Sequence, residues 1–200
     1  IVKGNTISNN IAEHGGGIRS DSENIIISDN TIEYNNAVGD GGGIKLRDSA
    51  SNQILNNIIK GNEAQVGGGI YGGATGSGNT IIGNSAIMVG GYVVSSSDTG
   101  KFSNNYVLNN KGTYAAYFWE GRDVTDNIFA GNEQALFYKN TPGHGGHFYI
   151  GDNDNLPSSR IVSNNVIFNN TTSPSVYFYG LDMDYDLYDP ETGEQERIVS

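Results

Sequence analysis

Asparagine and apolar positions follow a pattern that the chain repeats seven times. Each copy consists of an asparagine, any residue, an apolar residue, two further residues and a second asparagine. The copies are Asn5/Ile7/Asn10, Asn30/Ile32/Asn35, Asn57/Ile59/Asn62, Asn79/Ile81/Asn84, Asn105/Val107/Asn110, Asn127/Phe129/Asn132 and Asn165/Ile167/Asn170. Their second asparagines are 25, 27, 22, 26, 22 and 38 residues apart. A period of about 20 to 50 residues is typical of solenoids, whose coils bury their apolar sides by stacking on one another.

Two further apolar positions accompany each copy. One lies three residues before the first asparagine, at Val2, Ile27, Ile54, Phe102, Val124 and Val162, with Gly76 as the exception. The other follows the second asparagine by eight or nine residues, at Ile18, Ile44, Ile70, Tyr92, Phe118 and Phe178. Three apolar positions separated by Asn and Gly corners predict three short strands per coil, and no window has helical periodicity. We therefore expect an all-β parallel β-helix of about seven coils, with asparagine amides bonded from coil to coil.

These repeats resemble those of right-handed parallel β-helix proteins, the pectate-lyase-like superfamily, over nearly the whole chain. The resemblance implies a right-handed coil, in line with the general preference for right-handed crossovers. The segment from Tyr179 to Tyr188, read together with the Asn-rich coils, is similar to the β-helix domains of the archaeal disaggregatase family. Those are secreted proteins that break up the polysaccharide coat holding cells in clumps. This likeness implies an extracellular or cell-surface protein that degrades a polysaccharide.

Composition narrows the classes of partner. The formal net charge of −11 argues against nucleic acid, whose phosphates require a basic surface, and against anionic lipid. No apolar run approaches the ~18 residues of a membrane span, and the chain has no cysteine for disulfides. We expect one β-helix domain over residues 1–200, cut from a longer protein with further domains because the chain begins in mid-repeat. Within it, residues 139–159 are predicted to be an insertion and residues 182–200 an acidic C-terminal segment.

Strand alternation predicts a column of outward side chains next to the third apolar position. If Ile18, Ile44, Ile70, Phe118 and Phe178 point inward, the residues that follow them point outward. The predicted column contains Arg19, Lys45, Tyr71, Val93 in the fourth coil, Trp119, Tyr138 in the sixth coil and Tyr179, and Arg47 extends its basic end. Cations can receive the carboxylates of a uronic-acid polymer, and aromatic faces can stack on sugar rings. Ordinary solvated surface is the alternative interpretation.

Consecutive glycines precede the same apolar position in the first four coils, at Gly17, Gly43, Gly69 and Gly91. They predict either a tight corner or a trench beside the outward column, because glycine has no side chain. The two interpretations are compatible.

Candidate catalytic residues lie in the later coils. Glu120 and Asp123 flank Arg122, and paired carboxylates could act as general acid and base on a glycosidic bond. A solvated turn with a local ion pair is the alternative. A lyase would need a base and a cation, for which Lys139, Arg122, Tyr138 and His147 are available.

The predicted insertion contains His144, His147 and the acidic string from Asp152 to Asp154. Two histidines three residues apart on a glycine loop do not define a metal site without a third ligand. The acidic string lacks the spacing of a twelve-residue calcium loop. We expect no cofactor, with calcium as the one candidate.

The leading hypothesis is an extracellular hydrolase or lyase acting on a uronic-acid-containing cell-surface glycan. The alternative is a non-catalytic carbohydrate-binding, adhesin or structural module, since a β-helix does not by itself determine function. An ice-binding solenoid would need a regular column of threonines, which the repeats do not predict.

Overall fold

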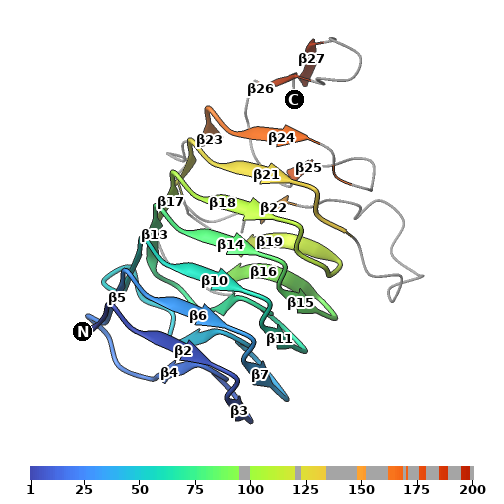
Figure 1. The fold of residues 1–200 in the computed structure, drawn as a ribbon. Coiled ribbons are helices and arrows are strands. Elements are labelled where there is room, and N and C mark those ends of the chain that lie inside the picture. Colours follow the sequence, from blue (N-terminus) through green and yellow to red (C-terminus); the bar gives the residue numbers. More distant parts are fainter. Residues whose placement is uncertain are drawn as a thin grey trace.

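Four parallel sheets form the sides of one solenoid in the computed structural model of the chain (Figure 1). The structure describes residues 1–94, 100–119, 123–133, 148–151, 162–168, 170, 176–178, 185–188 and 195–198. Each coil visits the sheets in the same order, so strands that are distant in sequence lie side by side. The all-β parallel solenoid predicted from the repeats is confirmed.

The first two sheets lie on either side of the first asparagine of each repeat. Sheet A has seven strands: β1 (Val2–Lys3), β5 (Ile26–Ser28), β9 (Gln53–Leu55), β13 (Thr75–Ser77), β17 (Lys101–Ser103), β20 (Asp123–Thr125) and β23 (Val162–Ser163). Sheet B also has seven strands: β2 (Thr6–Ser8), β6 (Thr31–Glu33), β10 (Ile58–Lys60), β14 (Thr80–Ile82), β18 (Tyr106–Leu108), β21 (Ile128–Ala130) and β24 (Val166–Phe168).

The remaining two sheets complete the coil. Sheet C has four strands: β3 (Ile11–Ala12), β7 (Asn36–Ala37), β11 (Glu63–Ala64) and β15 (Ser85–Ala86). Sheet D has seven strands: β4 (Ile18–Ser20), β8 (Ile44–Leu46), β12 (Ile70–Tyr71), β16 (Val89–Val94), β19 (Tyr114–Trp119), β22 (Phe148–Gly151) and β25 (Val176–Phe178). Isolated bridges at Lys111 and Glu133 continue sheet C beyond β15.

The prediction of three strands per coil is wrong, because sheet C is a fourth side. Its strands are only two residues long, and their inward residues Ala37, Ala64 and Ala86 are buried but small. A search for large apolar residues therefore passes over them. Three sheets have one strand from each of the seven repeats, and about five turns are complete with all four sides.

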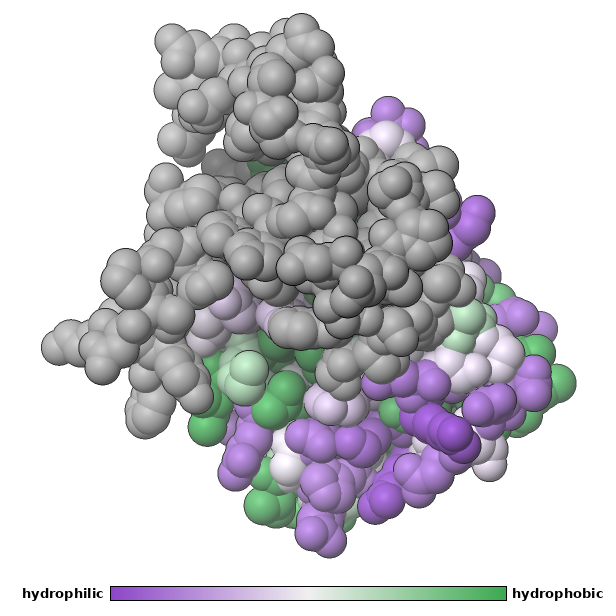
Figure 2. All heavy atoms as spheres, turned by 180° about the vertical axis from the view of Figure 1, so that it is seen from behind, coloured by the Kyte–Doolittle hydropathy of each residue, from purple (hydrophilic) through white to green (hydrophobic). Residues whose placement is uncertain are grey.

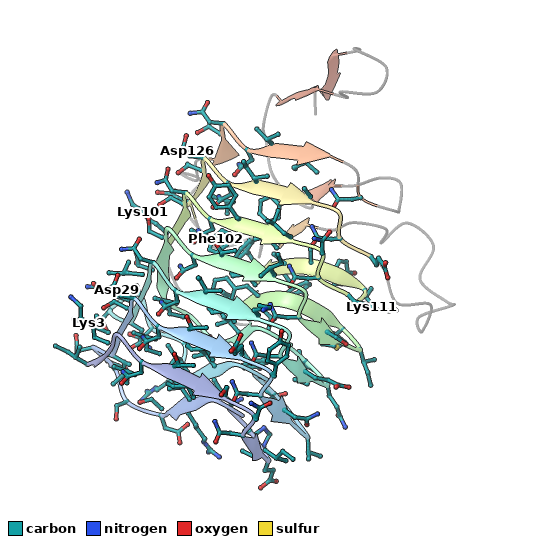
Figure 3. The ribbon with its side chains drawn as sticks, viewed as in Figure 1. Lys3, Asp29, Lys101, Phe102, Lys111 and Asp126 are labelled. Carbon is teal, nitrogen blue, oxygen red and sulfur yellow. The ribbon has the colours of Figure 1, made fainter. Side chains whose placement is uncertain are left out.

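Two of the three predicted apolar columns, those of sheets A and B, lie in register inside the coil, whereas in sheet D the partner of Tyr92 is Ala116 and not the predicted Phe118. In sheet B, for example, Ile32 pairs with Ile59 and Ile59 with Ile81, and all three are buried. The exceptional Gly76 lies in register with Phe102 of the next coil in sheet A. Figure 3 shows the ring of Phe102 pointing into the interior, while Lys3, Asp29 and Lys101 project outward. The core is thus a continuous stack along the axis.

Both asparagines of the repeat form ladders, as predicted. In the first ladder, Nδ2 and the backbone N–H of Asn57 donate to Oδ1 of Asn79 at 3.1 and 2.9 Å. Nδ2 of Asn57 also donates to the carbonyls of Ile27 and Leu55, at 2.9 and 3.0 Å. Each buried amide therefore satisfies backbone groups at a corner that the sheets leave unpaired.

The glycine corners are close backbone contacts, which confirms the corner interpretation and excludes the trench. A Cβ atom on Gly43 would lie 2.6 Å from the carbonyl oxygen of Gly69 and 3.1 Å from Nδ2 of Asn62. Gly43 therefore faces packed chain, where a side chain does not fit. The left-handed backbone that favours glycine occurs two residues earlier, at Gly41, whose φ is 69°.

Both predicted C-terminal segments contain described strands. Residues 148–151, inside the predicted insertion of residues 139–159, form β22, which pairs with β19 and β25 in sheet D. In the predicted acidic segment of residues 182–200, β26 (Tyr185–Tyr188) and β27 (Gln195–Ile198) form a separate antiparallel pair. Within the part of the chain that the structure describes, no helix has the length and hydropathy needed to cross a bilayer.

Candidate functional site

The outer face of sheet D has one column of side chains in unbroken register. Arg19 pairs with Lys45, Lys45 with Tyr71, Tyr71 with Val93, and Val93 with Tyr117. The backbone register continues from Tyr117 to Tyr149 and Tyr177. We call these seven residues the sheet D column. Its order is basic in the first two coils and mostly aromatic afterwards, as the sequence predicts.

The predicted place of Trp119 in the column is wrong, and two further predicted members lie outside the described residues. Trp119 is in register with Gly151, two residues beyond the column, and Tyr117 takes the predicted place. Tyr149 and Tyr177 hold the sixth and seventh positions that were predicted for Tyr138 and Tyr179, both of which lie outside the described residues. The cause is the segment from Lys111 to Ala116, which is two residues shorter than the matching segment from Ser85 to Tyr92, with one residue of the difference at the register shift between Val89 and Tyr92.

Lys45 is held by groups on two sides. Its Nζ atom lies 2.8 Å from Oδ2 of Asp40 and 3.9 Å from the centroid of the Tyr71 ring. The Lys45 side chain is 18% exposed, so this ion pair and cation–π contact are partly shielded from water. Lys45 is thereby built into the corner between sheets C and D, and the sequence analysis missed Asp40 as its partner.

His14 packs beside the same carboxylate. The backbone N–H of Asp40 donates to His14 Nδ1 at 3.1 Å, and that nitrogen lies 3.5 Å from Asp40 Oδ2. Nδ1 of His14 is therefore the acceptor for the Asp40 backbone at this corner.

Arg19 of the column and the neighbouring Arg47 project into solvent. Arg19 donates to Asp21 at 3.2 Å, and Arg47 lies 3.7 Å from Glu23. The Arg19 side chain is 50% exposed and the Arg47 side chain is 63% exposed. Exposed pairs of this kind contribute only about 0 to 1 kcal/mol, so an incoming anion can replace either carboxylate at little cost.

The aromatic part of the column is partly covered. Tyr71 and Tyr117 are half-buried, whereas Val93 between them is only 4% exposed. The rings of Tyr114 and Tyr117 lie 5.6 Å apart at an angle of 47°. The sequence analysis did not predict that Tyr114 joins this face. Its spacing of three residues from Tyr117, in a strand whose pairing has a register shift, is the signal that could have indicated it.

The described cations of the sheet D face are paired with carboxylates. Arg19, Lys45 and Arg47 contact Asp21, Asp40 and Glu23 respectively. Figure 2, seen from the side opposite to Figure 1, shows hydrophilic and hydrophobic side chains interspersed on the described part of the surface. The face thus offers polar groups and tyrosine rings without a large field of one sign.

The predicted catalytic group is described only at Asp123. This residue begins β20 in sheet A, and its carboxylate lies 3.7 Å from Nζ of Lys101, its neighbour in register on β17. Glu120, Lys139 and His147, like Arg122, lie outside the described residues, and of Trp119 only the backbone is described. The arrangement of a catalytic set is therefore untested.

Metal ligation has no support in the described part of the chain. No group of three or more His, Asp or Glu side chains there could hold a metal ion. The histidine pair His144 and His147 and the acidic string from Asp152 to Asp154, which raised calcium as a candidate, lie outside the described residues.

Comparison with known proteins agrees with the solenoid geometry. A family model described as right handed beta helix region matches residues 1–155. No curated protein and no solved structure matched the chain. The matched residues cover more than half of the chain, including the first five coils and the Arg19 to Tyr117 part of the sheet D column. The chain therefore belongs to the right-handed β-helix family.

Proposed function

We propose that this chain is an extracellular polysaccharide-active β-helix domain that binds a glycan chain along the sheet D column. The right-handed β-helix is a fold common to polysaccharide-active enzymes and adhesins. The observation that carries the proposal is the register from Arg19 through Lys45 and Tyr71 to Tyr117. Fold alone does not determine function, so the argument depends on this face.

The column matches the chemistry of an extended sugar polymer. Parallel strands stack at about 4.8 Å, so the same face is repeated along the axis and a repeating ligand can contact several coils. Tyrosine rings offer flat apolar surface with a polar hydroxyl, which suits the two faces of a sugar ring. The fixed position of Lys45 between Asp40 and Tyr71 preorganises the second position of the column.

A uronic-acid-containing glycan is the ligand that we propose for the basic end. Arg19 and Arg47 are exposed, and a uronate carboxylate could replace Asp21 or Glu23 as their bidentate partner. Lys45 is less available, because its ammonium group already contacts Asp40 and Tyr71. To bind a uronate, Arg19 and Arg47 must therefore release the carboxylates of Asp21 and Glu23 and bind the carboxylate of the sugar instead.

Polysaccharide cleavage is the finer form of the proposal. The likeness to disaggregatases depends on the segment from Tyr179 to Tyr188, which lies beyond the residues 1–155 matched by the family model. The described carboxylate candidate, Asp123, is paired with Lys101 on sheet A. A non-catalytic glycan-binding or adhesin module is the second candidate, and this pairing of Asp123 favours it.

We expect Arg19→Ala to weaken the binding of polygalacturonate or alginate about tenfold, because one charge-assisted contact is worth roughly 1.5 kcal/mol. Isothermal titration calorimetry at low and high salt measures the effect, and the affinity should fall as salt screens the contact. Lys3→Ala is the matched control, since Lys3 is an exposed cation that pairs with Asp29 on sheet A. Equal losses in both variants, or no binding to any polymer in a broad panel, would contradict the proposal.

Incubation with the same polymers separates cleavage from binding. A hydrolase releases reducing ends, and a lyase also produces an unsaturated product with ultraviolet absorbance. If the protein binds a polymer but forms neither product, it is the non-catalytic binding module. If cleavage occurs, Glu120→Gln, Lys139→Met and His147→Ala identify which predicted residues take part.

A further inference from the structure

One corner of the coil has an unusual residue at Tyr34. The residue that directly follows each of the first six strands of sheet B has a left-handed backbone, with φ between 51° and 63°. These residues are Asn9, Tyr34, Gly61, Gly83, Asn109 and Gly131. Glycine and asparagine tolerate this conformation, whereas in other residues Cβ crowds the following carbonyl oxygen. Among the described non-glycine residues with positive φ, every one except Tyr34 is Asn or Asp.

The strain at Tyr34 does not serve the core. Its φ is 54°, yet the residue is 50% exposed and lies outside the buried cluster. The neighbouring coils hold the same corner with Asn9 and Gly61, so the fold itself does not need an aromatic ring here. A bulky residue kept in a disfavoured conformation on the surface is a reason to look for a function, because such strain collects at functional sites.

The surroundings of the Tyr34 ring are polar and ordered. A Cβ atom on Gly61 would lie 2.7 Å from Cε1 of Tyr34, so the glycine of the next coil leaves room for the ring. Nζ of Lys60 lies 5.1 Å from the ring centroid and 3.7 Å from Oε2 of Glu33. The side-chain hydrogen bond with Tyr34, and then charge interactions with Tyr34 and Glu33, raise the pKa of Lys60 above its ordinary value. Lys60 is therefore charged at neutral pH.

We infer that Tyr34, Lys60 and Glu33 form a second carbohydrate-binding site, on the outer face of sheet B. A sugar ring would stack its C–H face on the exposed tyrosine ring. The Lys60 ammonium would donate to one sugar hydroxyl, and the Glu33 carboxylate would accept from another. The exposed Ile58, which lies two residues before Lys60 on β10, would provide an apolar border to the ring.

The charge of this site selects the class of sugar. Lys60 and Glu33 neutralise each other, and neither side chain is fully buried, so donor and acceptor are both accessible. A neutral hexose can satisfy both groups with its hydroxyls, which accept from Lys60 and donate to Glu33, whereas a uronate carboxylate has no proton to donate to Glu33. The site differs from the sheet D column in residues and location, since the strands of sheet B lie in front in Figure 1 and those of sheet D behind them. The inference therefore does not depend on the proposed function of the sheet D column.

Replacement of Tyr34 by asparagine tests the inference, because the fold already uses asparagine at this corner. We expect Tyr34→Asn to lower the affinity for a neutral oligosaccharide about tenfold, the loss expected when one good stacking contact is removed. The thermal midpoint should stay unchanged or rise, since the left-handed strain is relieved. A purely structural tyrosine that shields Lys60 and Gly61 would give the opposite sign, with a lower midpoint and unchanged binding.

Titration calorimetry with a panel of cello-, xylo-, manno-, malto- and chito-oligosaccharides provides the measurement. Tyr106→Ala is the matched control, because Tyr106 is equally exposed on the same face but has no left-handed backbone and is expected to leave binding unchanged. Lys60→Met, which keeps the side-chain stem, should also weaken binding, while Lys3→Ala, which changes an exposed cation of sheet A, should leave it intact. The inference is overturned if no oligosaccharide of the panel binds, if Tyr34→Asn binds like wild type, or if Tyr34→Asn lowers the midpoint.

Discussion

Replacement of Asn84 by alanine is expected to lower the free energy of unfolding by roughly 3 to 6 kcal/mol, since each buried group left unsatisfied costs about 1 to 3 kcal/mol. The side chain is 0% exposed, and its Oδ1 accepts from the backbone N–H and from Nδ2 of Asn62, both at 3.0 Å. Its Nδ2 donates to the Ile59 carbonyl at 2.9 Å and to Asn110 Oδ1 at 3.0 Å. Alanine would leave groups of two neighbouring coils without partners in the interior.

Denaturant-induced unfolding followed by circular dichroism measures the loss at Asn84. Asn5→Ala is the matched control, because Asn5 is exposed at the first coil and its Nδ2 donates only to Lys3 O and Asn30 Oδ1. The control should cost about 1 kcal/mol or less, as expected for accessible groups that water can satisfy. Similar losses in the two variants would mean that the ladder stabilises the coil less than its geometry indicates.

The asparagine ladders could be predicted because they recur at a fixed place in each repeat and their chemistry is local. Asparagine tolerates corner conformations, and one amide can both donate and accept, so position and residue type together imply the coil-to-coil bonds. The fourth side of the coil could not be predicted in the same way. The inward residues of sheet C are alanines such as Ala37 and Ala64, which do not stand out in a search for bulky apolar periodicity.

The sheet D column shows where counting from the asparagines fails. Tyr92 follows Asn84 by eight residues (92 − 84), whereas its partner in register, Ala116, follows Asn110 by six (116 − 110). The register shifts between Val89 and Tyr92, so one strand contains an extra residue. A change of two residues preserves the inward and outward alternation, which explains why the aromatic character of the column was predicted correctly and Trp119 was not.

The ion pairs of the sheet D face also could not be predicted from the repeat pattern. The sequence analysis considered Arg19, Lys45 and Arg47 as cations open to a ligand. Their carboxylate partners come from the corners, where residue spacing varies between coils, and Asp40 reaches Lys45 from the other side of a glycine turn. The repeat pattern determines where the strands lie, but it does not determine where the side chains of the corners lie.

Replacement of Phe102 by alanine is expected to lower the free energy of unfolding by about 3 to 5 kcal/mol, the usual loss for a buried phenylalanine. The residue is 1% exposed, and its ring centroid lies 5.0 Å from that of Phe118 and 5.3 Å from that of Tyr92. Phe129 of the next coil lies 6.4 Å away. The four rings form one cluster across three coils, so the cavity would disturb several windings at once. Denaturant unfolding measures the loss.

Gly76 and Phe102 are expected to be coupled, because the ring fills the space that the missing side chain leaves. A Cβ atom on Gly76 would lie 3.1 Å from Cδ2 of Phe102, so Gly76→Val alone should overpack the core and cost about 1 to 3 kcal/mol. In the Phe102→Ala background the valine should instead fill part of the cavity, and the double variant should be more stable than the sum of the single losses by about 0.5 to 3 kcal/mol. Additive losses in this double-mutant cycle would show that Gly76 interrupts the apolar column for a reason other than the size of Phe102. A cooperative gain would explain why a column of large apolar residues tolerates one glycine. The large Phe102 ring would then compensate for the missing side chain of Gly76, so that the two adjacent coils together fill the core.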